Sequence, residues 1–418
     1  MVKELIDPVM AIDLPADWNL VPLGNCVTEK LSYGINAPAI PYRPGFPRYI
    51  RITDITEDGQ FDDGDPKSVI TAEREKYTLK NGDIVLARTG ASTGKSYLYR
   101  RSDGKLVYAG FLIKASIDIA HHNPRFIVGQ LMTKRYWNWI ATTSMRSGQP
   151  GINGKEYSSF LIPVAPKKEQ EEIARTLSEF DTYIDDLAEL IEKKRGIREG
   201  ALEDLICQRT RMAGFTGEWT NVSFNQVITP KARIGWQGLK KHEYLRSGYS
   251  YLIGGTDFDH GTVSLDNISF VSKERYDMDV NIQVSENDVL VTKDGTIGKV
   301  AMVPCLEKPA TLNSGVFVFR TNDRLMPTFL FRVLLSSIFK GFIDTLSAGS
   351  TIKHLYQKDL KDFEFKMPVD LEEQKAIADA LTAMDEEVEA LENERDKMIQ
   401  IREGAMDDLL TGRIRLNL

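Results

Sequence analysis

The chain has 418 residues and a formal net charge of −7; 42% of its residues are hydrophobic and 27% are charged. This size allows two or three domains with separate cores, and the composition is ordinary for a soluble globular protein. There is no apolar run of about 18 residues, and the first residues include acids and a proline, so we expect neither a membrane span nor a signal peptide. Three widely separated cysteines argue against a disulfide framework and for a reducing cytoplasm.

Residues 1–166 form the first predicted domain. Short β-branched and aromatic runs, separated by Gly, Pro, Asn and Asp turns, predict its strands. Apolar residues spaced by three and four over 126–143 predict a helix packed against the sheet. The pair Asp17-Trp18 opens the domain, and we expect Trp18 in the core because apolar residues flank it at strand spacing. The domain is therefore predicted as α+β, with a mixed or antiparallel sheet.

A glycine-rich turn, Gly90-Ala91-Ser92-Thr93-Gly94-Lys95-Ser96, resembles a phosphate-binding loop in composition. That loop needs a longer spacing between its glycines than the three residues found here, and Thr89 stands where the first glycine would be required. A tight hairpin turn that presents a lysine is the simpler interpretation. A nucleotide-dependent enzyme built around this turn is the alternative hypothesis.

The segment Asn123-Pro124-Arg125-Phe126 differs by one residue from the Asn-Pro-Pro-aromatic motif of adenine methyltransferases, because Arg125 replaces the second proline. No glycine-rich S-adenosylmethionine loop follows a suitable first strand. Asn123 is better interpreted as a helix cap, with the proline in the first turn. No Ser-His-Asp order, zinc-protease motif or close carboxylate cluster is found either, so the sequence indicates a chain without catalytic activity.

Residues 167–212 form the first predicted spacer helix. Its apolar residues step by four and three, which gives a coiled-coil seam that needs a partner helix. Packing of the helix on its own domain is the alternative. The predicted seam consists of Ile173, Leu177, Phe180, Ile184 and Leu187.

Residues 213–370 form the second predicted domain, which repeats the pattern of the first. It opens on an acidic–tryptophan pair, and a strand-like run is again followed by a glycine turn and a Gly-Lys pair. Apolar spacing over 327–346 again predicts a packed helix. The matched segments are Asp17-Trp18 with Glu218-Trp219, Gly82–Arg88 with Asn287–Lys293, and Gly94-Lys95 with Gly298-Lys299.

Residues 371–418 form the second predicted spacer helix and the C-terminus. Placing Lys167–Met212 over Leu371–Leu416, at a constant offset of 204, needs no gap, and 17 of the 46 pairs are identical. Because this period is too long for a solenoid, a domain with its helix has been duplicated. We expect an antiparallel coiled coil with the two pseudo-symmetric domains at its opposite ends. The second seam consists of Ile377, Leu381, Met384, Val388 and Leu391.

Acidic residues are concentrated in the two predicted helices. Residues 167–212 include 9 basic and 12 acidic residues, and residues 371–416 include 6 and 13. The rest of the chain has 38 basic and 35 acidic residues, so its net charge is slightly positive. The negative charge of the whole chain therefore does not exclude DNA as a ligand.

Two copies of one motif connect these features to a known family. Glu169-Gln170-Glu171-Glu172-Ile173-Ala174 and Glu373-Gln374-Lys375-Ala376-Ile377-Ala378 each close a variable domain and begin a long helix. Together with the acidic–tryptophan pairs, this organisation resembles the DNA specificity subunit of type I restriction–modification enzymes over essentially the whole chain. The resemblance implies that each globular domain is a target-recognition domain for one half of a split DNA site. It also implies that the helix pair sets the gap between the halves.

The same resemblance implies the partners. Two methyltransferase subunits would dock on the helix pair, and restriction subunits would join through the methyltransferase core. S-adenosylmethionine and ATP with magnesium are then expected on partner subunits, with no cofactor or metal in this chain. Because the two domains differ in surface sequence, the double-stranded DNA target should be asymmetric. A protein-binding coiled-coil scaffold without a role on DNA is the remaining alternative.

The candidate DNA contacts are cationic and polar residues of the turns. Phosphates favour Lys and Arg, and base edges are read by Arg, Lys, Asn, Gln, Ser and Thr. A solvated surface charge is the alternative for each residue. In the first domain the candidates are Arg88, Lys95, Arg100, Arg101, Arg146, Ser147 and Gln149. In the second they are Lys231, Arg233, Lys240, Lys241, Arg246, Lys293 and Lys299.

Overall fold

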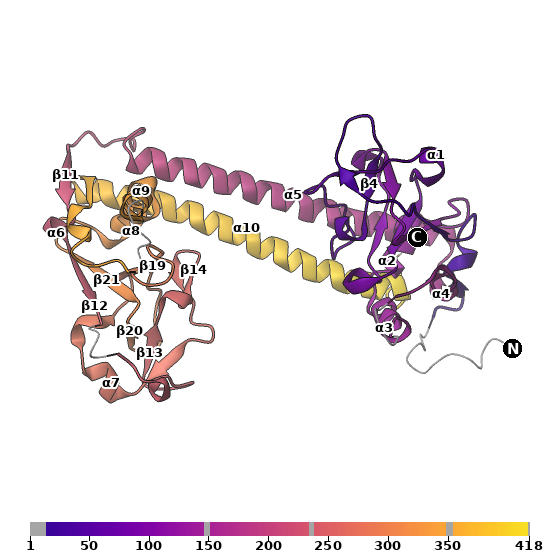
Figure 1. Ribbon diagram of the computed structural model, residues 1–418. Helices are drawn as coiled ribbons and strands as arrows, with labels where there is room; N and C mark the ends of the chain where they lie inside the picture. Colours follow the sequence, from indigo (N-terminus) through magenta and orange to yellow (C-terminus); the bar gives the residue numbers. More distant parts are fainter. Residues whose placement is uncertain (1–13, 146–150, 234–237, 348–353, 417–418) are drawn as a thin grey trace. The chain divides into compact units, whose positions relative to one another are not determined.

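The computed structural model of the protein describes residues 14–145, 151–233, 238–347 and 354–416 (Figure 1). The chain divides into two compact units. Unit 1 is Met1–Ala188 with Asn393–Leu418, and unit 2 is Glu189–Glu392. Each unit holds one domain of mixed helix and sheet together with a section of both long helices, which confirms the predicted fold class.

In the described part of unit 1, three sheets build the domain. Two have four strands, in the orders β2-β9-β6-β7 and β3-β5-β4-β8, and the third is the pair β1-β10. β6 is antiparallel to β9, whereas β4 is parallel to β8, so the strand arrangement is mixed. The strands are β1 (Asn19–Pro22), β2 (Ser32–Tyr33), β3 (Ile40–Pro41), β4 (Arg48–Ile50), β5 (Lys67–Ser68), β6 (Asp83–Ala87), β7 (Ser96–Leu98), β8 (Leu106–Tyr108), β9 (Leu112–Ser116) and β10 (Leu161–Val164).

Two helices cover the main core of unit 1 where the sequence predicts one over 126–143. Thr133 divides them, because its hydroxyl donates to Gln130 O at 2.9 Å and accepts from the Tyr136 N–H at 3.3 Å. Such a cap starts a new helix. Asn123 caps the first helix, as predicted, and Trp18 lies in this core. The helices are α1 (Arg74–Tyr77), α2 (Pro124–Gln130), α3 (Lys134–Thr143) and α4 (Gly154–Ser159), with short 3-10 turns η2 (Leu23–Asn25), η3 (Ile52–Asp54), η4 (Gly90–Ser92) and η5 (Arg101–Asp103).

The described residues of unit 2 also form three sheets. Their orders are β12-β21-β18-β19-β15-β14, β16-β13-β20-β17 and β11-β22. Antiparallel pairs predominate, and β13 is parallel to β20 just as β4 is parallel to β8 in unit 1. The strands are β11 (Trp219–Ser223), β12 (Ile228–Ala232), β13 (Ser250–Ile253), β14 (Phe258–Asp259), β15 (Thr262–Val263), β16 (Ser269–Val271), β17 (Gln283–Val284), β18 (Val289–Thr292), β19 (Val300–Met302), β20 (Ala310–Leu312), β21 (Val316–Thr321) and β22 (Glu364–Pro368).

The helical region predicted over 327–346 is also divided in two. Ser336 takes the place of Thr133, and its hydroxyl donates to Val333 O at 2.7 Å. The resulting helices, α8 and α9, cover the main core of unit 2. The helices are α6 (Phe224–Val227), α7 (Lys273–Asp277), α8 (Pro327–Leu335) and α9 (Ser337–Ser347), with 3-10 turns η7 (Lys241–Glu243), η8 (Gly255–Asp257), η9 (Val280–Ile282) and η10 (Leu360–Asp362).

The two long helices are α5 (Lys167–Ile206) and α10 (Leu371–Thr411). α5 stops six residues before the end predicted from the 46-residue repeat. Gln208 explains this end, because its φ of 59° is left-handed and cannot continue an α-helix. Gly412 occupies the same repeat position after α10 and has a φ of 72°. Both copies therefore end their long helix in the same way, although only one uses glycine.

The long helices pair in an antiparallel manner within each unit. In unit 2, Arg198 of α5 binds Asp385 of α10 at 2.9 Å, and Arg211, further along the chain, binds Glu373, which precedes Asp385. Unit 1 shows the same opposite progression. There, contacts from α5 residues 169, 181 and 183 reach residues 415, 402 and 394 at and beyond α10. The residue numbers of the partners decrease as the residue numbers along α5 increase, as expected for antiparallel helices.

The predicted seam residues face inward. All ten are buried or half-buried along the two helices. Ile173 and Leu177 also belong to the core of the first domain, together with Met406, Leu409 and Leu410 of α10. The helix ends therefore pack on each other and on a domain at once. The two interpretations of the seam, as a helix pair and as a domain contact, both describe part of it.

The Glu-Gln motif joins each domain to the helix pair. Glu169 is fully buried, accepts from Trp18 Nε1 at 3.1 Å and binds Arg415 through two hydrogen bonds of 2.7 and 2.9 Å. These bonds, and those to Asp17, raise the pKa of the Arg415 guanidinium. Buried carboxylates require such partners. We call this set the glutamate joint of unit 1.

Unit 2 has the equivalent glutamate joint. Glu373 accepts from Trp219 Nε1 at 3.1 Å and from Arg211 Nε and Nη2 at 2.9 and 2.8 Å. The following glutamine is buried as well, and Gln374 Oε1 accepts from the Met326 N–H just before α8. The motif therefore has a structural role in both units. Across the described residues, none of the helices is long and apolar enough to cross a membrane.

Candidate nucleic-acid interface

Arg88 lies at the end of β6, beside the exposed ring of Tyr33. Its N–H donates to Phe111 O at 3.1 Å, and its carbonyl accepts from the Ile152 N–H at 2.9 Å. Its guanidinium carbon lies 4.9 Å from the ring centroid of Tyr33, whose hydroxyl accepts from the Gly154 N–H at 3.0 Å. Tyr33 and Phe111 are 42% and 57% exposed. A cation stacked on an aromatic ring is thus oriented at the surface of unit 1.

Lys293 occupies the same backbone position in unit 2, at the end of β18. Its N–H donates to Gly315 O at 2.9 Å, and its carbonyl accepts from the Leu355 N–H at 2.8 Å. Its ammonium lies 5.6 Å from the centroid of the Phe317 ring. The position is therefore the same in both units, whereas the cation and its aromatic partner differ.

Polar and aromatic side chains lie on the segment whose Leu355 N–H bonds to the Lys293 carbonyl. His354 Nδ1 and Asp294 Oδ1 are 2.7 Å apart, and both residues are part of the backbone bridge that follows β18. The exposed ring of Tyr356 lies 6.1 Å from the imidazole, and the Lys358 ammonium lies 5.4 Å from the same ring. This surface of unit 2 offers donors, acceptors and a stacking ring together.

The glycine turn is a hairpin turn between β6 and β7, as the simpler interpretation predicts. The N–H groups of Thr93, Gly94 and Lys95 donate to Gly90 O, Ala87 O and Ser92 O at 3.0–3.1 Å. A phosphate-binding loop instead directs successive amides at its ligand. These three amides are already used within the hairpin, which argues against nucleotide binding.

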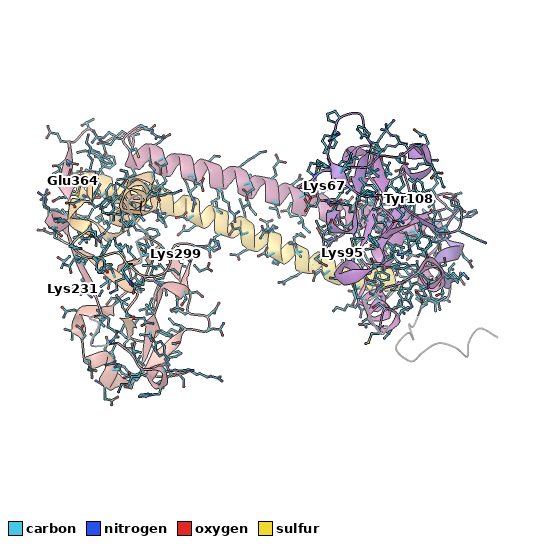
Figure 2. The ribbon with its side chains drawn as sticks, viewed as in Figure 1. Lys67, Lys95, Tyr108, Lys231, Lys299 and Glu364 are labelled. Atoms are coloured by element: carbon cyan, nitrogen blue, oxygen red, sulfur yellow. The ribbon has the colours of Figure 1, made fainter. Side chains whose placement is uncertain are left out.

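The two turn lysines, Lys95 and Lys299, are labelled in Figure 2 and differ in their contacts. The Lys95 ammonium donates to Ile55 O at 3.3 Å and lies 2.8 Å from a Glu57 carboxylate oxygen. Lys299 is exposed on the equivalent turn of unit 2. Lys299 is therefore exposed to solvent, whereas Lys95 is held within its domain.

Arg233 is not presented at the surface, in contrast to the prediction. It is only 2% exposed, and its Nε donates to Leu312 O at 3.0 Å while Nη2 donates to Thr311 Oγ1 at 3.4 Å. Burial lowers the pKa of Arg233. A basic run in a turn-rich segment has no periodicity that separates buried from exposed positions, so the sequence did not distinguish this residue.

The other candidates lie on exposed turns or at a strand edge. Arg100 and Arg101 are exposed at η5, where Arg100 Nε is 3.2 Å from Asp103. Lys231 is half-buried on the edge strand β12. Lys240, Lys241 and Arg246 are exposed. Arg146, Ser147 and Gln149 lie outside the described residues.

Sequence reasoning missed the aromatic and histidine side chains of this interface. Tyr33, Phe111 and Tyr356 are each isolated in the sequence, and His354 is distant from Asp294. The available signal was the repeat itself, since Arg88 and Lys293 end two matched strand segments. Among the described residues, no group of three or more His, Cys, Asp or Glu side chains could hold a metal ion.

Comparison with known proteins gives one consistent family. The model of the type I restriction modification DNA specificity domain matches residues 38–194 and 239–400. The MjaVIII specificity subunit of Methanocaldococcus jannaschii is 22% identical over 435 positions, covering 99% of this chain and 97% of that protein. The putative MjaX specificity subunit of the same organism is 25% identical, covering 97% and 95%.

Solved structures show the same fold. The type I restriction–modification S subunit from M. genitalium superimposes with a TM-score of 0.60 at 16% identity, covering 95% of this chain and 96% of that chain. A chain from a structure on complex assembly and conformational transition of the type I R-M system gives a TM-score of 0.57 at 16% identity, covering 97% and 100%.

Proposed function

The chain belongs to the type I restriction–modification DNA specificity family, and we propose that its two units each read one half of a split, asymmetric DNA site while the reaction chemistry belongs to partner subunits. The chain is thus a specificity subunit with two tandem target-recognition domains. We further propose which residues contact DNA and which partner subunits bind the chain. Its compartment is then expected to be the cytoplasm.

The equivalent placement of Arg88 and Lys293 is the observation on which this proposal rests. Two copies of one fold present a cation at the same strand end, yet with different neighbours. An arginine stacked on tyrosine suits bidentate recognition of guanine, whereas a lysine donates as a point charge. The two half-sites should therefore differ. Lys299 and the exposed cations of both domains would contact phosphates, which fix register.

Paired pockets support two equivalent docks for one kind of partner. Unit 1 has a pocket of about 590 Å³ beside α3 and α10, and unit 2 has one of about 510 Å³ beside α5 and α8. Four repeat-equivalent positions line them, namely Arg402, Glu403, Met406 and Asp407 in unit 1 and Arg198, Glu199, Leu202 and Glu203 in unit 2. We propose that a methyltransferase subunit docks at each pocket, with S-adenosylmethionine bound to that subunit and ATP with magnesium bound to partner restriction subunits.

The helix pair would act as a spacer between the two half-sites. Two linked recognition sites bind DNA together only when their separation matches that of the half-sites. Since phosphate contacts dominate affinity and this chain is acidic overall, we expect weak DNA binding by the chain alone.

Methylation mapping in cells with and without this gene tests the proposal. The expected result is a single split, asymmetric motif whose modification requires the gene. In solution, adding the methyltransferase subunit should convert weak DNA binding into tight, sequence-selective binding. No gene-dependent motif in the cells, or equally tight binding without the subunit, would contradict the proposal.

A further inference from the structure

A repeat-equivalent aspartate lies on each long helix, Asp181 on α5 and Asp385 on α10. Each accepts a hydrogen bond from an arginine of the opposite long helix. Arg402 Nε lies 2.6 Å from Asp181 Oδ1, and Arg198 Nη1 lies 2.9 Å from Asp385 Oδ1. These arginines are repeat-equivalent too, since both belong to the Ile-Arg-Glu-Gly-Ala sequence. The aspartates therefore connect the two helices at matched positions.

Each aspartate also binds an arginine from the globular domain of its own unit. Arg125 of α2 donates to the second oxygen of Asp181, and Arg332 of α8 donates to that of Asp385 at 2.5 Å. The two aspartates and Arg125 are partly buried, and the Arg332 side chain is 6% exposed, so these pairs are screened less than surface ion pairs. We call each set an aspartate junction. It links both long helices to a domain helix, α2 in unit 1 and α8 in unit 2.

The helices that supply the domain arginines, α2 and α8, pack on a tryptophan in the same way in the two units. Phe126 of α2 packs edge-on against Trp18 with ring centroids 6.0 Å apart and an interplanar angle of 71°. Phe329 of α8 packs on Trp219 at 6.0 Å and 72°. The arrangement of the helix on its tryptophan is therefore the same, which fixes the correspondence between α2 and α8.

The arginines nevertheless come from different positions on these helices. By that correspondence Arg125 matches Thr328, and Arg332 matches Gly129, one helical turn later. A side chain at position 129 is obstructed, because an ideal Cβ there would lie 3.0 Å from a Leu410 methyl carbon. Unit 1 thus uses the earlier position and unit 2 the later one. Each unit thus pairs its repeat-equivalent aspartate with a domain arginine, although the arginine comes from a different helix position. This points to a shared requirement for the junction.

We propose that the aspartate junctions fix the angle at which each domain is held on the helix pair, and thereby restrict the gap between the half-sites that the protein accepts. One additional base pair moves a half-site by about 3.4 Å along the duplex and by about 35° around it. A domain free to rotate on its helices can follow such a shift, whereas a domain tied by Asp181 or Asp385 cannot. This inference rests on the proposed function.

The test compares gap lengths in methylated sites, with the complete enzyme in cells. Asp181→Asn, Asp385→Asn and Arg332→Gln are each expected to raise the fraction of sites one base pair longer or shorter by about tenfold, which corresponds to loss of a charged hydrogen bond. The half-site sequences should not change. Glu179→Gln, which alters an exposed ion pair of α5, is the matched control and should keep a single gap.

Relocation of the arginine provides the decisive variant. Thr328→Arg places the cation at the position that Arg125 occupies in unit 1, so adding it to Arg332→Gln should restore the single gap. Thermal unfolding identifies the variants that fold. If an aspartate variant does not fold, Arg332→Gln replaces it in the test. Unchanged gaps in folded variants, altered half-sites, or no restoration by Thr328→Arg would overturn the inference. If the unaltered protein directs methylation of no split site, the proposed function fails instead.

Discussion

Unit 1 and unit 2 each contain a glutamate joint of the same kind, but they are assembled from different numbers of chain segments. Unit 2 is one continuous segment, Glu189–Glu392, whereas unit 1 combines Met1–Ala188 with Asn393–Leu418. In unit 1, Gln130 Nε2 donates to Leu410 O at 2.7 Å, and Arg415 binds Glu169. Residues far apart in the sequence thus complete one core. The physical unit is a domain with sections of both helices rather than a continuous half of the sequence.

The largest expected effect separates the two units by their dependence on the C-terminal segment. Deleting residues 393–418 removes Met406, Leu409 and Leu410 from the core of unit 1. Buried side chains of this size each contribute about 2–5 kcal/mol, so their combined loss is comparable to the whole stability of a typical domain. Hydrogen exchange should show loss of protection in β6 and β9 of unit 1, while β18 and β21 of unit 2 stay protected. Equal loss in both units would contradict the division.

The glutamate joints should be equivalent when tested one at a time. Glu169→Ala leaves Trp18 Nε1 and Arg415 without their buried acceptor, and Glu373→Ala does the same in unit 2. Each is expected to lower the free energy of unfolding of its own unit by about 2–4 kcal/mol. Hydrogen exchange in denaturant, read separately for each unit, measures the change. Glu179→Ala at an exposed position should have little effect, and a similar loss there would mean that the joints are not special.

The repeat, the antiparallel seam and the core position of Trp18 follow from the sequence because regular spacing predicts which residues face inward. Local hydrogen bonds were less predictable. Thr133 and Ser336 divide helices whose apolar spacing runs on without interruption. Arg233 is buried, whereas Lys240 and Lys241 of the same predicted basic segment are exposed. Such outcomes depend on tertiary partners, which a single sequence does not specify.

Substitutions of Arg88 and Lys293 should affect different half-sites, whereas substitutions in the two glutamate joints should have equal effects. Arg88→Ala is expected to weaken recognition of one half-site by about 1–3 kcal/mol, and Lys293→Ala should affect only the other. Binding of the methyltransferase-bound chain to DNA variants, each altered in one half-site, measures both effects. Lys105→Ala removes an exposed cation outside the candidate set and serves as the control. Equal losses at both half-sites would show that these residues contact only backbone phosphates.

The smallest expected effect is a pH dependence confined to unit 1. Burial lowers the pKa of His122 below its ordinary value of 6.5, and its Nδ1 is buried without a hydrogen-bond partner among the described residues. The unfolded chain therefore binds a proton more readily, so stability is lost as pH falls below about 6.5. His122→Asn should reduce this loss in urea unfolding at pH 7.5 and about 5.5. If the pH dependence of stability does not change in this variant, groups other than His122 cause it.

Exchange of the first domain tests the central claim most directly. Residues 20–150 would be replaced by the corresponding segment of a family member with another target, and methylated sites would be mapped in cells that contain the complete enzyme. We predict that one half of the recognised site changes, while the other half and the gap stay the same. A change in both halves, or an unchanged site with a folded and active protein, would contradict recognition by two independent units.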